Sequence, residues 1–409
     1  MKVLVCNKFY YPVGGPETIV HDTVRELNAM GHTAIPFAMV HPSNWESDYA
    51  PYFVPNVDYT TKHGKSIGRL LKEGFDIVYS REARRCIERL IADTKPDIAH
   101  AHNIYHQLSP SILLALKKAG IPTALTLHDG KLVCANMLFY TKGKVCERCA
   151  GKKFYHAVLN KCVKDSYVSS ALCCLEETLH RLTRVYEKTV NLFITPSQFL
   201  KDRMVKSGRL PEKTVEVLYN YAETKNIKPN FTPGNYALFM GKVETFKGVP
   251  TLLKAALELP DIEIRIAGRG TYLEQGKRFA EENGLGNAHF LGFQTGSDLE
   301  RLRQEARFVV VPSEWYENCP MVVLEAFSAG KPVIGARIGG IPELVEHGVN
   351  GLLYEPGDAE GLAECMRKLS KDDDLVYEMG RKARIKAEEK YSLETYMQSL
   401  LDIYQRLLP

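Results

Sequence analysis

Short apolar runs alternate with longer amphipathic segments along the whole chain, and no other feature constrains the fold as strongly. In the first half, the runs that we interpret as strands are residues 2–6, 33–38, 98–102, 122–127 and 191–195. In the second half, they are residues 236–240, 262–267, 289–292, 308–311, 332–336 and 352–354. Buried strands separated by helix-length segments are typical of parallel sheets with crossover helices. We therefore expect an α/β protein.

The length of the chain predicts two domains, because 409 residues exceed what one hydrophobic core usually supports. Prolines and asparagines gather between residues 220 and 235, which we interpret as the linker. We expect residues 1–220 and 221–390 to form two Rossmann-like doubly wound domains that face a central cleft. Residues 391–409 are expected to form a C-terminal helix that can pack back on the N-terminal domain. Ligands of such sheets bind beyond the carboxyl ends of the strands, so function is expected in the loops there.

Composition and cysteine usage indicate a folded protein of a reducing compartment. Hydrophobic residues make up 45% of the chain and charged residues 25%, which argues against disorder. Asn7 and Lys8 cut the first apolar run short, so neither a signal peptide nor a membrane span fits there. Ten cysteines without a secretion signal are expected to be thiols or metal ligands and not disulfides.

The two halves of the chain carry opposite net charge. Residues 1–210 contain 29 Lys and Arg against 19 Asp and Glu, whereas the remainder contains 24 against 30. A basic half beside an acidic half is expected to attract an anionic surface or substrate. No motif that reads nucleic acid accompanies the charge, so we expect no nucleic-acid partner.

The segment at residues 311–326 carries the strongest functional pattern. A buried strand ends at Pro312, a polar loop contains Glu317, and a helix is expected to begin at Pro320. The free amides and the dipole of a helix start attract phosphate. Glu325 lies more than a turn inside this helix, whose apolar residues make a buried-looking face, so it is hard to dismiss as a surface acid. The residues expected around the helix start are Asn318, Cys319, Pro320 and Met321. The alternative is an ordinary loop with surface acids.

Lys242 and Lys247 lie in a loop that follows the first strand of the second half and opens at Gly241. Two cations five residues apart can bind a diphosphate from two sides and stabilise it as it leaves. The alternative is a pair of solvated lysines. In the first half, Gly14 and Gly15 precede a helix expected at residues 18–30, and glycines there let the backbone approach a ligand.

These motifs resemble the retaining glycosyltransferases with the GT-B fold that share an E-x7-E motif, usually called family 4. The motif here is Glu317-x7-Glu325, and the resemblance covers nearly the whole chain because several separated motifs recur in order. It implies that Glu317 lies by the donor sugar and that Glu325 binds the ribose. The family commonly has Arg at the position of Lys242. A lysine there offers a point charge in place of the bidentate fork of an arginine.

In the first half, the resemblance places His128 beside the donor sugar as an orienting, polar contact. It also places the loop of Gly14 and Gly15 over the donor phosphates and the acceptor. The residues expected to line the acceptor side are His100, His102 and Asn103.

In the second half, the resemblance places Gly241 and Gly268 against the nucleotide and makes Phe293 a candidate for backbone contacts to the base. A further family element at residues 339–343 has no role that the sequence explains. For all of these positions the alternative is ordinary turn geometry.

Four cysteines follow His128 in the pattern Cys134-x11-Cys146-x2-Cys149-x12-Cys162, which is not part of the general family pattern. A close C-x2-C pair suits one side of a tetrahedral structural zinc site. Free thiols and a redox role are the alternatives.

Residues 131–164 carry eight Lys and Arg against the single acid Glu147, together with four aromatic side chains. These aromatic residues are Phe139, Tyr140, Phe154 and Tyr155. A basic surface with aromatic side chains can bind an anionic bilayer or a lipid-linked diphosphate acceptor. The alternative is that the segment is a solvated charged loop. We therefore expect a cytoplasmic protein that can lie peripherally on the inner face of the plasma membrane.

The resemblance implies a retaining transferase of the hexosyltransferase type that moves a sugar from a nucleotide diphosphate donor to an acceptor hydroxyl. UDP is favoured because it is frequent in the family, and the acceptor is expected to be a glycan or a lipid-linked substrate of cell-surface polysaccharide or glycolipid synthesis. No cofactor is expected in the chemistry, because lysines and the helix start take the place of a divalent ion. A nucleotide-sugar epimerase and a non-catalytic nucleotide-sugar binding protein are the alternatives.

Overall fold

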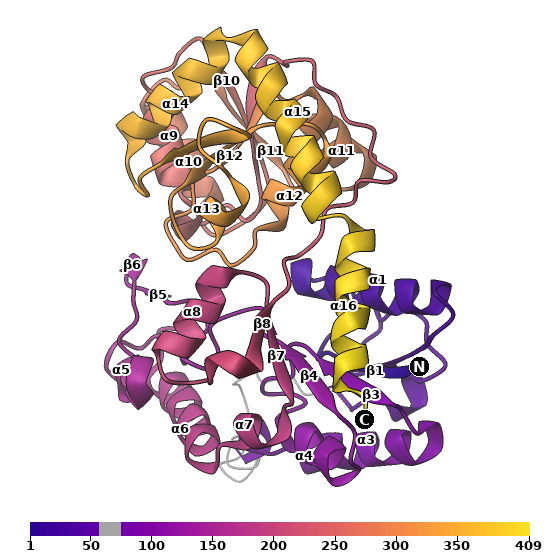
Figure 1. Ribbon diagram of the computed structural model, residues 1–409. Coiled ribbons are helices and arrows are strands. Elements are labelled where there is room, and N and C mark those ends of the chain that lie inside the picture. Colours follow the sequence, from indigo (N-terminus) through magenta and orange to yellow (C-terminus); the bar gives the residue numbers. More distant parts are fainter. Residues whose placement is uncertain (57–74) are drawn as a thin grey trace.

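Two α/β domains lie one above the other in the computed structural model, which describes residues 1–56 and 75–409 (Figure 1). In the N-terminal domain the parallel sheet has the order β2-β1-β3-β4-β7-β8. Its strands are β1 (Lys2–Cys6), β2 (Thr33–Phe37), β3 (Ile98–Ala101), β4 (Thr123–Thr126), β7 (Leu192–Thr195) and β8 (Val215–Val217). Its helices of eight or more residues are α1 (Gly15–Ala29), α3 (Arg81–Thr94), α4 (Ser111–Lys118), α6 (Tyr167–Thr183) and α8 (Gln198–Lys206), and α7 (Val185–Thr189) is shorter.

The C-terminal domain repeats this architecture with the parallel order β11-β10-β9-β12-β13-β14. Its strands are β9 (Tyr236–Met240), β10 (Glu263–Ala267), β11 (Ala288–Gly292), β12 (Phe308–Val311), β13 (Val333–Ala336) and β14 (Gly351–Tyr354). Its helices are α9 (Val249–Ala256), α10 (Leu273–Glu282), α11 (Gly296–Glu305), α12 (Met321–Ser328), α13 (Ile341–Leu344), α14 (Ala359–Lys371) and α15 (Asp373–Lys390).

Alternate residues of each strand enter cores on opposite faces of the sheet. In β1, Leu4 and Cys6 pack into one core, whereas Val3 and Val5 pack into the other. Strand β9 divides in the same way between two cores of the C-terminal domain. Both faces of each sheet are thus covered at these central strands, which explains why they are continuous apolar runs in the sequence, whereas β10 and the edge strand β11 are less completely buried. The predicted α/β fold of two Rossmann-like domains is confirmed.

The predicted strands agree with the structure to within one residue at each end. Three short strands were not predicted. Strand β8 is only three residues long, and β5 (Tyr140–Thr141) and β6 (Lys144–Val145) form a hairpin of two residues a side. Such short segments carry too few residues to show a period.

The strand orders determine where ligands can bind. In the C-terminal sheet the order of strands reverses between β9 and β12, and in the N-terminal sheet it reverses between β1 and β3. Loops at such a switch point diverge to opposite faces and leave a crevice at the carboxyl ends of the strands. The loops that follow these four strands contain Lys247, Glu317, Gly14 and His102.

The chain crosses between the domains twice. No regular helix or strand lies between Val217 and Tyr236. The second crossing follows α15, after which α16 (Leu393–Leu407) returns to the N-terminal domain (Figure 1). There Tyr396, Leu400 and Tyr404 pack into the same core as Val3 and Val5. The structure thus has a helix at the C-terminal end of the chain, and this helix packs on the N-terminal domain.

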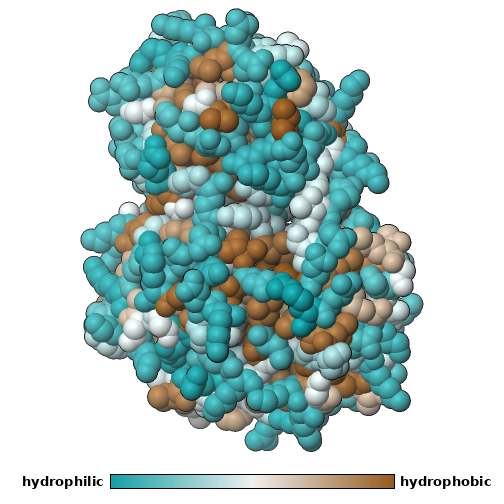
Figure 2. Space-filling view, in the orientation of Figure 1, coloured by the Kyte–Doolittle hydropathy of each residue, from teal (hydrophilic) through white to brown (hydrophobic). Residues whose placement is uncertain are grey.

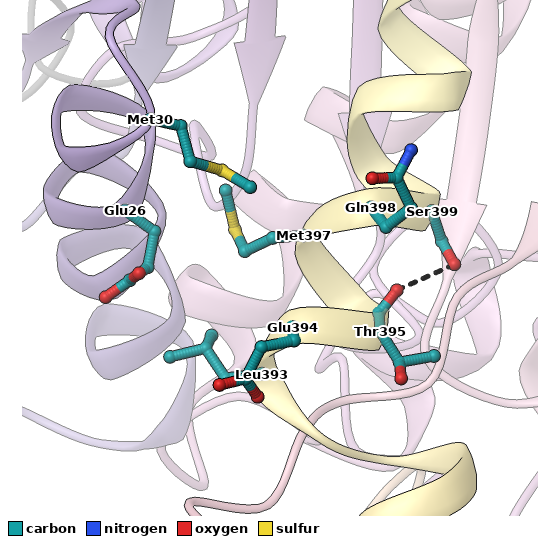
Figure 3. Close-up of a pocket in the computed structure, with 8 residues that line it drawn as sticks. All are labelled: Glu26, Met30, Leu393, Glu394, Thr395, Met397, Gln398 and Ser399. Carbon is teal, nitrogen blue, oxygen red and sulfur yellow. Dashed lines mark hydrogen bonds between the residues drawn. The ribbon is translucent and has the colours of Figure 1, made fainter. Parts of the chain in front are cut away.

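A hollow of about 490 Å³ lies where α16 meets α1 (Figure 3). Met30 of α1 and Met397 of α16 point toward one another there, and the other lining residues are mostly polar. None of the predicted site residues lines this hollow.

The surface in the same view is largely hydrophilic, with hydrophobic patches that gather on the lower domain below the junction (Figure 2). Among the residues that the structure describes, no helix has both the length and the apolar character that a membrane crossing requires.

Candidate active site

Glu317 lies in the loop between β12 and α12 and is 7% exposed. Its Oε1 atom accepts hydrogen bonds from Ser313 Oγ at 2.7 Å and Trp315 Nε1 at 2.9 Å. It also lies 2.6 Å from Lys247 Nζ. Burial by itself would raise the pKa of Glu317, but Lys247 and the two neutral donors outweigh burial and lower it. The site therefore holds a carboxylate and not a carboxylic acid.

The loop of Lys247 packs directly on the loop of Glu317. Gly248 has φ of 74°, and a Cβ atom there would lie 1.7 Å from the carbonyl oxygen of Pro312. Only glycine fits this turn, which delivers the ammonium of Lys247 to Glu317 and to within 4.9 Å of the Trp315 ring centroid. Lys242 belongs to the same loop, but it is exposed and does not join this cluster.

Three neighbouring strands of the C-terminal sheet end in glycines that touch. The amide of Gly268 donates to the carbonyl oxygen of Gly292 at 2.7 Å, and a Cβ atom on Gly268 would lie 1.8 Å from the carbonyl oxygen of Gly241. The ends of β9, β10 and β11 thus form a surface without side chains, against which a flat ligand can lie. Gly241 and Gly268 were predicted to lie against the nucleotide, and the structure brings them together.

Phe293 follows this surface and is 60% exposed. The guanidinium carbon of Arg269 lies 4.6 Å from its ring centroid, in a cation–π contact. Arg269 was not predicted as a site residue. Arg269 directly follows Gly268 at the end of a strand, and this position could have identified it as a site residue.

Glu325 faces α11 and not the core. Its side chain is 40% exposed, and Oε2 lies 2.9 Å from Nη1 of Arg303. Glu325 is only partly buried, because the buried face of α12 is made by its neighbours Val323, Leu324 and Ala326. Arg303 was missed, since its pairing depends on how α11 packs beside α12. Exposure leaves one carboxylate oxygen of Glu325 accessible to a hydroxyl group.

The starts of α1 and α12 face one another across the domain junction. A Cβ atom on Gly15 would lie 3.2 Å from Cγ of Met321. Neither N-cap residue, Gly14 or Pro320, offers a side-chain cap, although the buried carboxylate of Glu17 lies in the first turn of α1. The free backbone amides of two helix starts that meet can bind an anion. Pro320 was predicted inside the first turn and is the residue just before it.

Cys319 precedes this helix start and is buried, and its carbonyl oxygen accepts a hydrogen bond from Asn220 Nδ2 at 3.1 Å. Asn318 Nδ2 donates to the carbonyl oxygen of His128 at 2.7 Å. The loop of Glu317 is therefore tied to the N-terminal domain by the backbone at His128.

His128 and His102 form a pair at the ends of β4 and β3, with Nε2 of His128 lying 3.0 Å from Nδ1 of His102. Burial lowers the pKa of His128 to about 4 and holds the pKa of His102 well below its usual range. Both rings are thus neutral near pH 7, and one must donate to the other. Nε2 of His102 has no hydrogen-bond partner among the described residues.

Two of the residues expected on the acceptor side differ in their surroundings. His100 is fully buried, with Nδ1 lying 2.7 Å from Tyr404 Oη and Nε2 lying 2.7 Å from Thr126 Oγ1. Its expected place on the acceptor side is wrong, because the ring is fully buried and its two nitrogens join Tyr404 of α16 to Thr126 of β4. Asn103 is buried beside His102, and its Oδ1 has no described partner.

Residues 339–343 acquire a role from the structure. The amide of Gly340 donates to the carbonyl oxygen of Glu317 at 2.7 Å. The carboxylate of Glu343 accepts from the amides of Gln198 at 2.8 Å and Phe199 at 2.6 Å, at the start of α8 in the other domain. This segment therefore supports the Glu317 loop and caps a helix of the N-terminal domain.

The basic segment at residues 131–164 is less exposed than predicted. Lys131 is fully buried, and its Nζ lies 2.7 Å from Glu176 and 3.2 Å from Glu177. Phe139 and Phe154 are also buried, so the predicted surface is wrong at these three positions.

Glu176 also belongs to two small groups of acid, histidine and cysteine side chains that could hold a cation, but the ammonium of Lys131 already occupies the place beside it.

Comparison with known proteins identifies the family. Residues 13–225 match the family described as Glycosyltransferase Family 4, and residues 220–386 match the one described as Glycosyl transferases group 1. The chain belongs to glycosyltransferase family 4. The family 4 chain is 25% identical to the uncharacterized glycosyltransferase MJ1178 of Methanocaldococcus jannaschii, over 100% of its own length and 99% of the relative's.

Solved structures confirm the GT-B fold of this glycosyltransferase. HepE of Anabaena, solved in complex with UDP, is 18% identical with a TM-score of 0.70, covering 99% of this chain and 100% of that one. WaaG, a glycosyltransferase involved in lipopolysaccharide biosynthesis, is 18% identical with a TM-score of 0.64, covering 98% and 99%.

Proposed function

We propose that this glycosyltransferase moves a sugar from a UDP-sugar to an acceptor hydroxyl with retention of the anomeric configuration. The Lys247–Glu317 pair just before the start of α12, which faces the start of α1, is the observation that carries this proposal. A diphosphate requires such a concentration of positive potential, and the sugar next to it would reach Glu317 and His128. The complex of HepE with UDP supports the choice of nucleotide.

The transfer needs charge stabilisation at the departing diphosphate. The bond between the anomeric carbon and the diphosphate oxygen breaks, and its electron pair stays on that oxygen. Lys247 and the amides at the starts of α1 and α12 stabilise the growing negative charge without a metal ion. The acceptor oxygen attacks the same face of the sugar, and its proton passes to the departing diphosphate. Lys242, exposed in the same loop, is expected to approach only when a ligand binds.

The remaining residues hold the donor and the acceptor. Glu325 accepts hydrogen bonds from the ribose hydroxyls, and the base lies near the backbone at Phe293. His128 orients the sugar as a neutral ring. His102 and Asn103 lie toward the acceptor, which is a glycan or a lipid-linked substrate of envelope polysaccharide or glycolipid synthesis. The role of WaaG in lipopolysaccharide biosynthesis supports that class of acceptor.

Helix α6 presents an apolar stripe to solvent. Its buried face carries the polar residues Ser170, Cys173, Glu176, Glu177 and His180. Its exposed face carries Val168, Leu172, Leu175, Leu179 and Leu182, at alternate spacings of four and three residues. A stripe of this kind marks an interaction surface. Exposed lysines of the preceding segment, Lys152, Lys153 and Lys164, lie close to it in the chain.

We propose that the α6 stripe and these lysines hold the enzyme on the inner face of an anionic membrane, where a lipid-linked acceptor lies. The test is flotation with vesicles of neutral lipid or of neutral and anionic lipid. Leu175→Asp with Leu182→Asp should abolish flotation on anionic vesicles, and Leu257→Asp, an exposed leucine of the other domain, should not. Absence of wild-type flotation on both vesicles would contradict docking, and an oligomer that the double variant abolishes would assign the stripe to a second copy.

The proposed transfer is tested by the release of UDP from a panel of UDP-, GDP- and ADP-sugars, with and without acceptor extracts. We expect UDP release that depends on the acceptor. The new glycosidic bond of the product should have the same anomeric orientation, axial or equatorial, as the sugar–phosphate bond of the donor. Epimer formed from donor alone would identify an epimerase. Tight UDP binding without turnover of any donor would identify a non-catalytic binding protein.

A further inference from the structure

The segment between His128 and α6 has little regular structure. Besides the hairpin of β5 and β6, residues 129–166 contain a single turn at Ala150–Lys152 and α5 (Tyr155–Leu159). Non-glycine residues with positive φ gather here: Met137, Phe139, Lys142, Lys152, Lys161, Lys164 and Asp165. A segment with so few ladder hydrogen bonds and so many unfavourable backbone conformations needs another source of stability.

Four cysteines of this segment line one cavity of about 10 Å³: Cys134, Cys146, Cys149 and Cys162. That volume has room for about one particle the size of a water molecule, so the cavity suits a single ion and not an organic ligand. Cys146 and Cys149 follow the hairpin, and the other two approach from 12 residues before and 13 residues after this pair. Two of the four thiols, Cys134 and Cys149, are buried.

Two of the four sulfur atoms lie beside polar side chains. Sγ of Cys134 lies 2.9 Å from Asn136 Oδ1, and Sγ of Cys162 lies 3.5 Å from Thr141 Oγ1. Among the described residues, the groups whose ligand atoms all lie within 4.8 Å of one another do not include this set. Side-chain rotation about χ1 would be needed to direct the four sulfurs at the cavity. Burial raises the pKa of Cys134 to about 12 and that of Cys149 to about 11, so without a cation both stay protonated.

We propose that Cys134, Cys146, Cys149 and Cys162 bind one zinc ion as four thiolates. Tetrahedral coordination by sulfur at about 2.3 Å is the geometry that zinc takes in structural sites with C-x2-C pairs. Each thiol loses its proton as it binds, and the ion undergoes no redox change. The ion links the distant parts of residues 129–166, which have few ladder hydrogen bonds to hold them together.

The zinc site would fix contacts that reach the donor loops. Glu147, between two of the cysteines, accepts a hydrogen bond from Tyr316 Oη at 2.6 Å and pairs with Arg203 at 2.8 Å. The ring of Tyr140 lies 5.8 Å from that of Phe246. Tyr316 and Phe246 directly precede Glu317 and Lys247, so the segment touches both loops of the donor site. Zinc binding therefore holds the N-terminal wall of this site in place.

The experiment measures zinc in the full-length protein, purified without chelator and after reconstitution with zinc. About one zinc ion per chain is expected, with loss of most of it in Cys146→Ser and Cys149→Ser. Cys365→Ser, a cysteine of the other domain, is the matched control and should keep the metal. Zinc content below about a tenth of an ion per reconstituted wild-type chain would overturn the proposal.

Because serine variants can misfold, two measurements use the wild type alone. Titration with a mercurial reagent should release the zinc in step with the modification of four thiols, and cobalt substitution should give the visible bands of a tetrahedral thiolate site. Release of zinc before these thiols react, or an octahedral cobalt spectrum, would contradict the four-cysteine ligand set. Neither readout depends on transferase activity.

Discussion

The Nζ atom of Lys247 lies 2.6 Å from Oε1 of Glu317, and the two residues belong to loops that follow the neighbouring strands β9 and β12. Each charge compensates the other in the ligand-free protein. Ser313 and Trp315 donate to the same oxygen, so the carboxylate keeps two partners when the ammonium turns toward an anion. The pair is thus suited to exchange its partner when a diphosphate binds.

Replacing Lys247 by Met should destabilise the ligand-free protein by about 1.5–3 kcal/mol, because a buried carboxylate loses its charged partner. Lys247→Met with Glu317→Gln should recover part of this loss, with a coupling energy of about 0.5–3 kcal/mol. Urea unfolding of the four proteins of the cycle measures both quantities. Additive effects would show that the two side chains do not interact in solution.

Gly340→Ala should disable the site while the fold survives. A Cβ atom at this position would lie 1.8 Å from the carbonyl oxygen of Asn318, so the loop of Glu317 must move. A displacement of about 1 Å can reduce turnover about 100-fold. Gly286→Ala is the control, since a Cβ atom there meets nothing within 4 Å. Equal kcat for the two variants would show that the position of this loop is unimportant.

Glu325→Ala should weaken UDP binding about 10- to 150-fold, which corresponds to the loss of hydrogen bonds to a charged group worth about 1.5–3 kcal/mol. The same variant should bind 2′,3′-dideoxy-UDP about as well as the wild type does, because the ribose hydroxyls are absent from that ligand. Calorimetric titration of both nucleotides gives the comparison. An equal loss for both ligands would mean that Glu325 acts through Arg303 and not through the ribose.

Acid should destabilise the N-terminal domain through its buried histidines. Burial lowers the pKa of His100 to about 3, so between about pH 6.5 and pH 3 the unfolded chain binds a proton that the folded chain does not. Folding stability therefore falls as the pH falls through this range, by about 1.4 kcal/mol per pH unit for this group.

His100→Gln removes this titration. The stability difference between wild type and His100→Gln, measured by urea unfolding, should shrink by about 2 kcal/mol from pH 7 to pH 5. Parallel stability curves would show that His100 is protonated in the folded state.

The fold could be predicted because both sheets are buried on two faces. Strands such as Tyr236–Met240 are then apolar throughout, and the lengths between them fit only crossover helices. The loops of Lys247 and Glu317 could be located for the same reason, since each directly follows such a strand. What the sequence did not show was the short strand β8, whose three residues carry no period.

Contacts between elements distant in the chain could not be predicted. Arg303 reaches Glu325 only because α11 lies beside α12, and His100 meets Tyr404 across 304 positions. Lys131 was assigned to the surface on its charge alone, whereas two glutamates of α6 compensate it in the interior. The role of Glu343 depends on the contact between domains, which no local pattern encodes.

The central claim is that a nucleotide diphosphate sugar binds at Lys247 and the two helix starts. Thermal unfolding with UDP-, GDP- and ADP-sugars, in the wild type and in Lys247→Met, tests it most directly. A UDP-sugar at 100 times its Kd should stabilise the wild type by about 2.7 kcal/mol and stabilise the variant clearly less. No stabilisation by any nucleotide sugar at millimolar concentration, or equal stabilisation of both proteins, would contradict the claim.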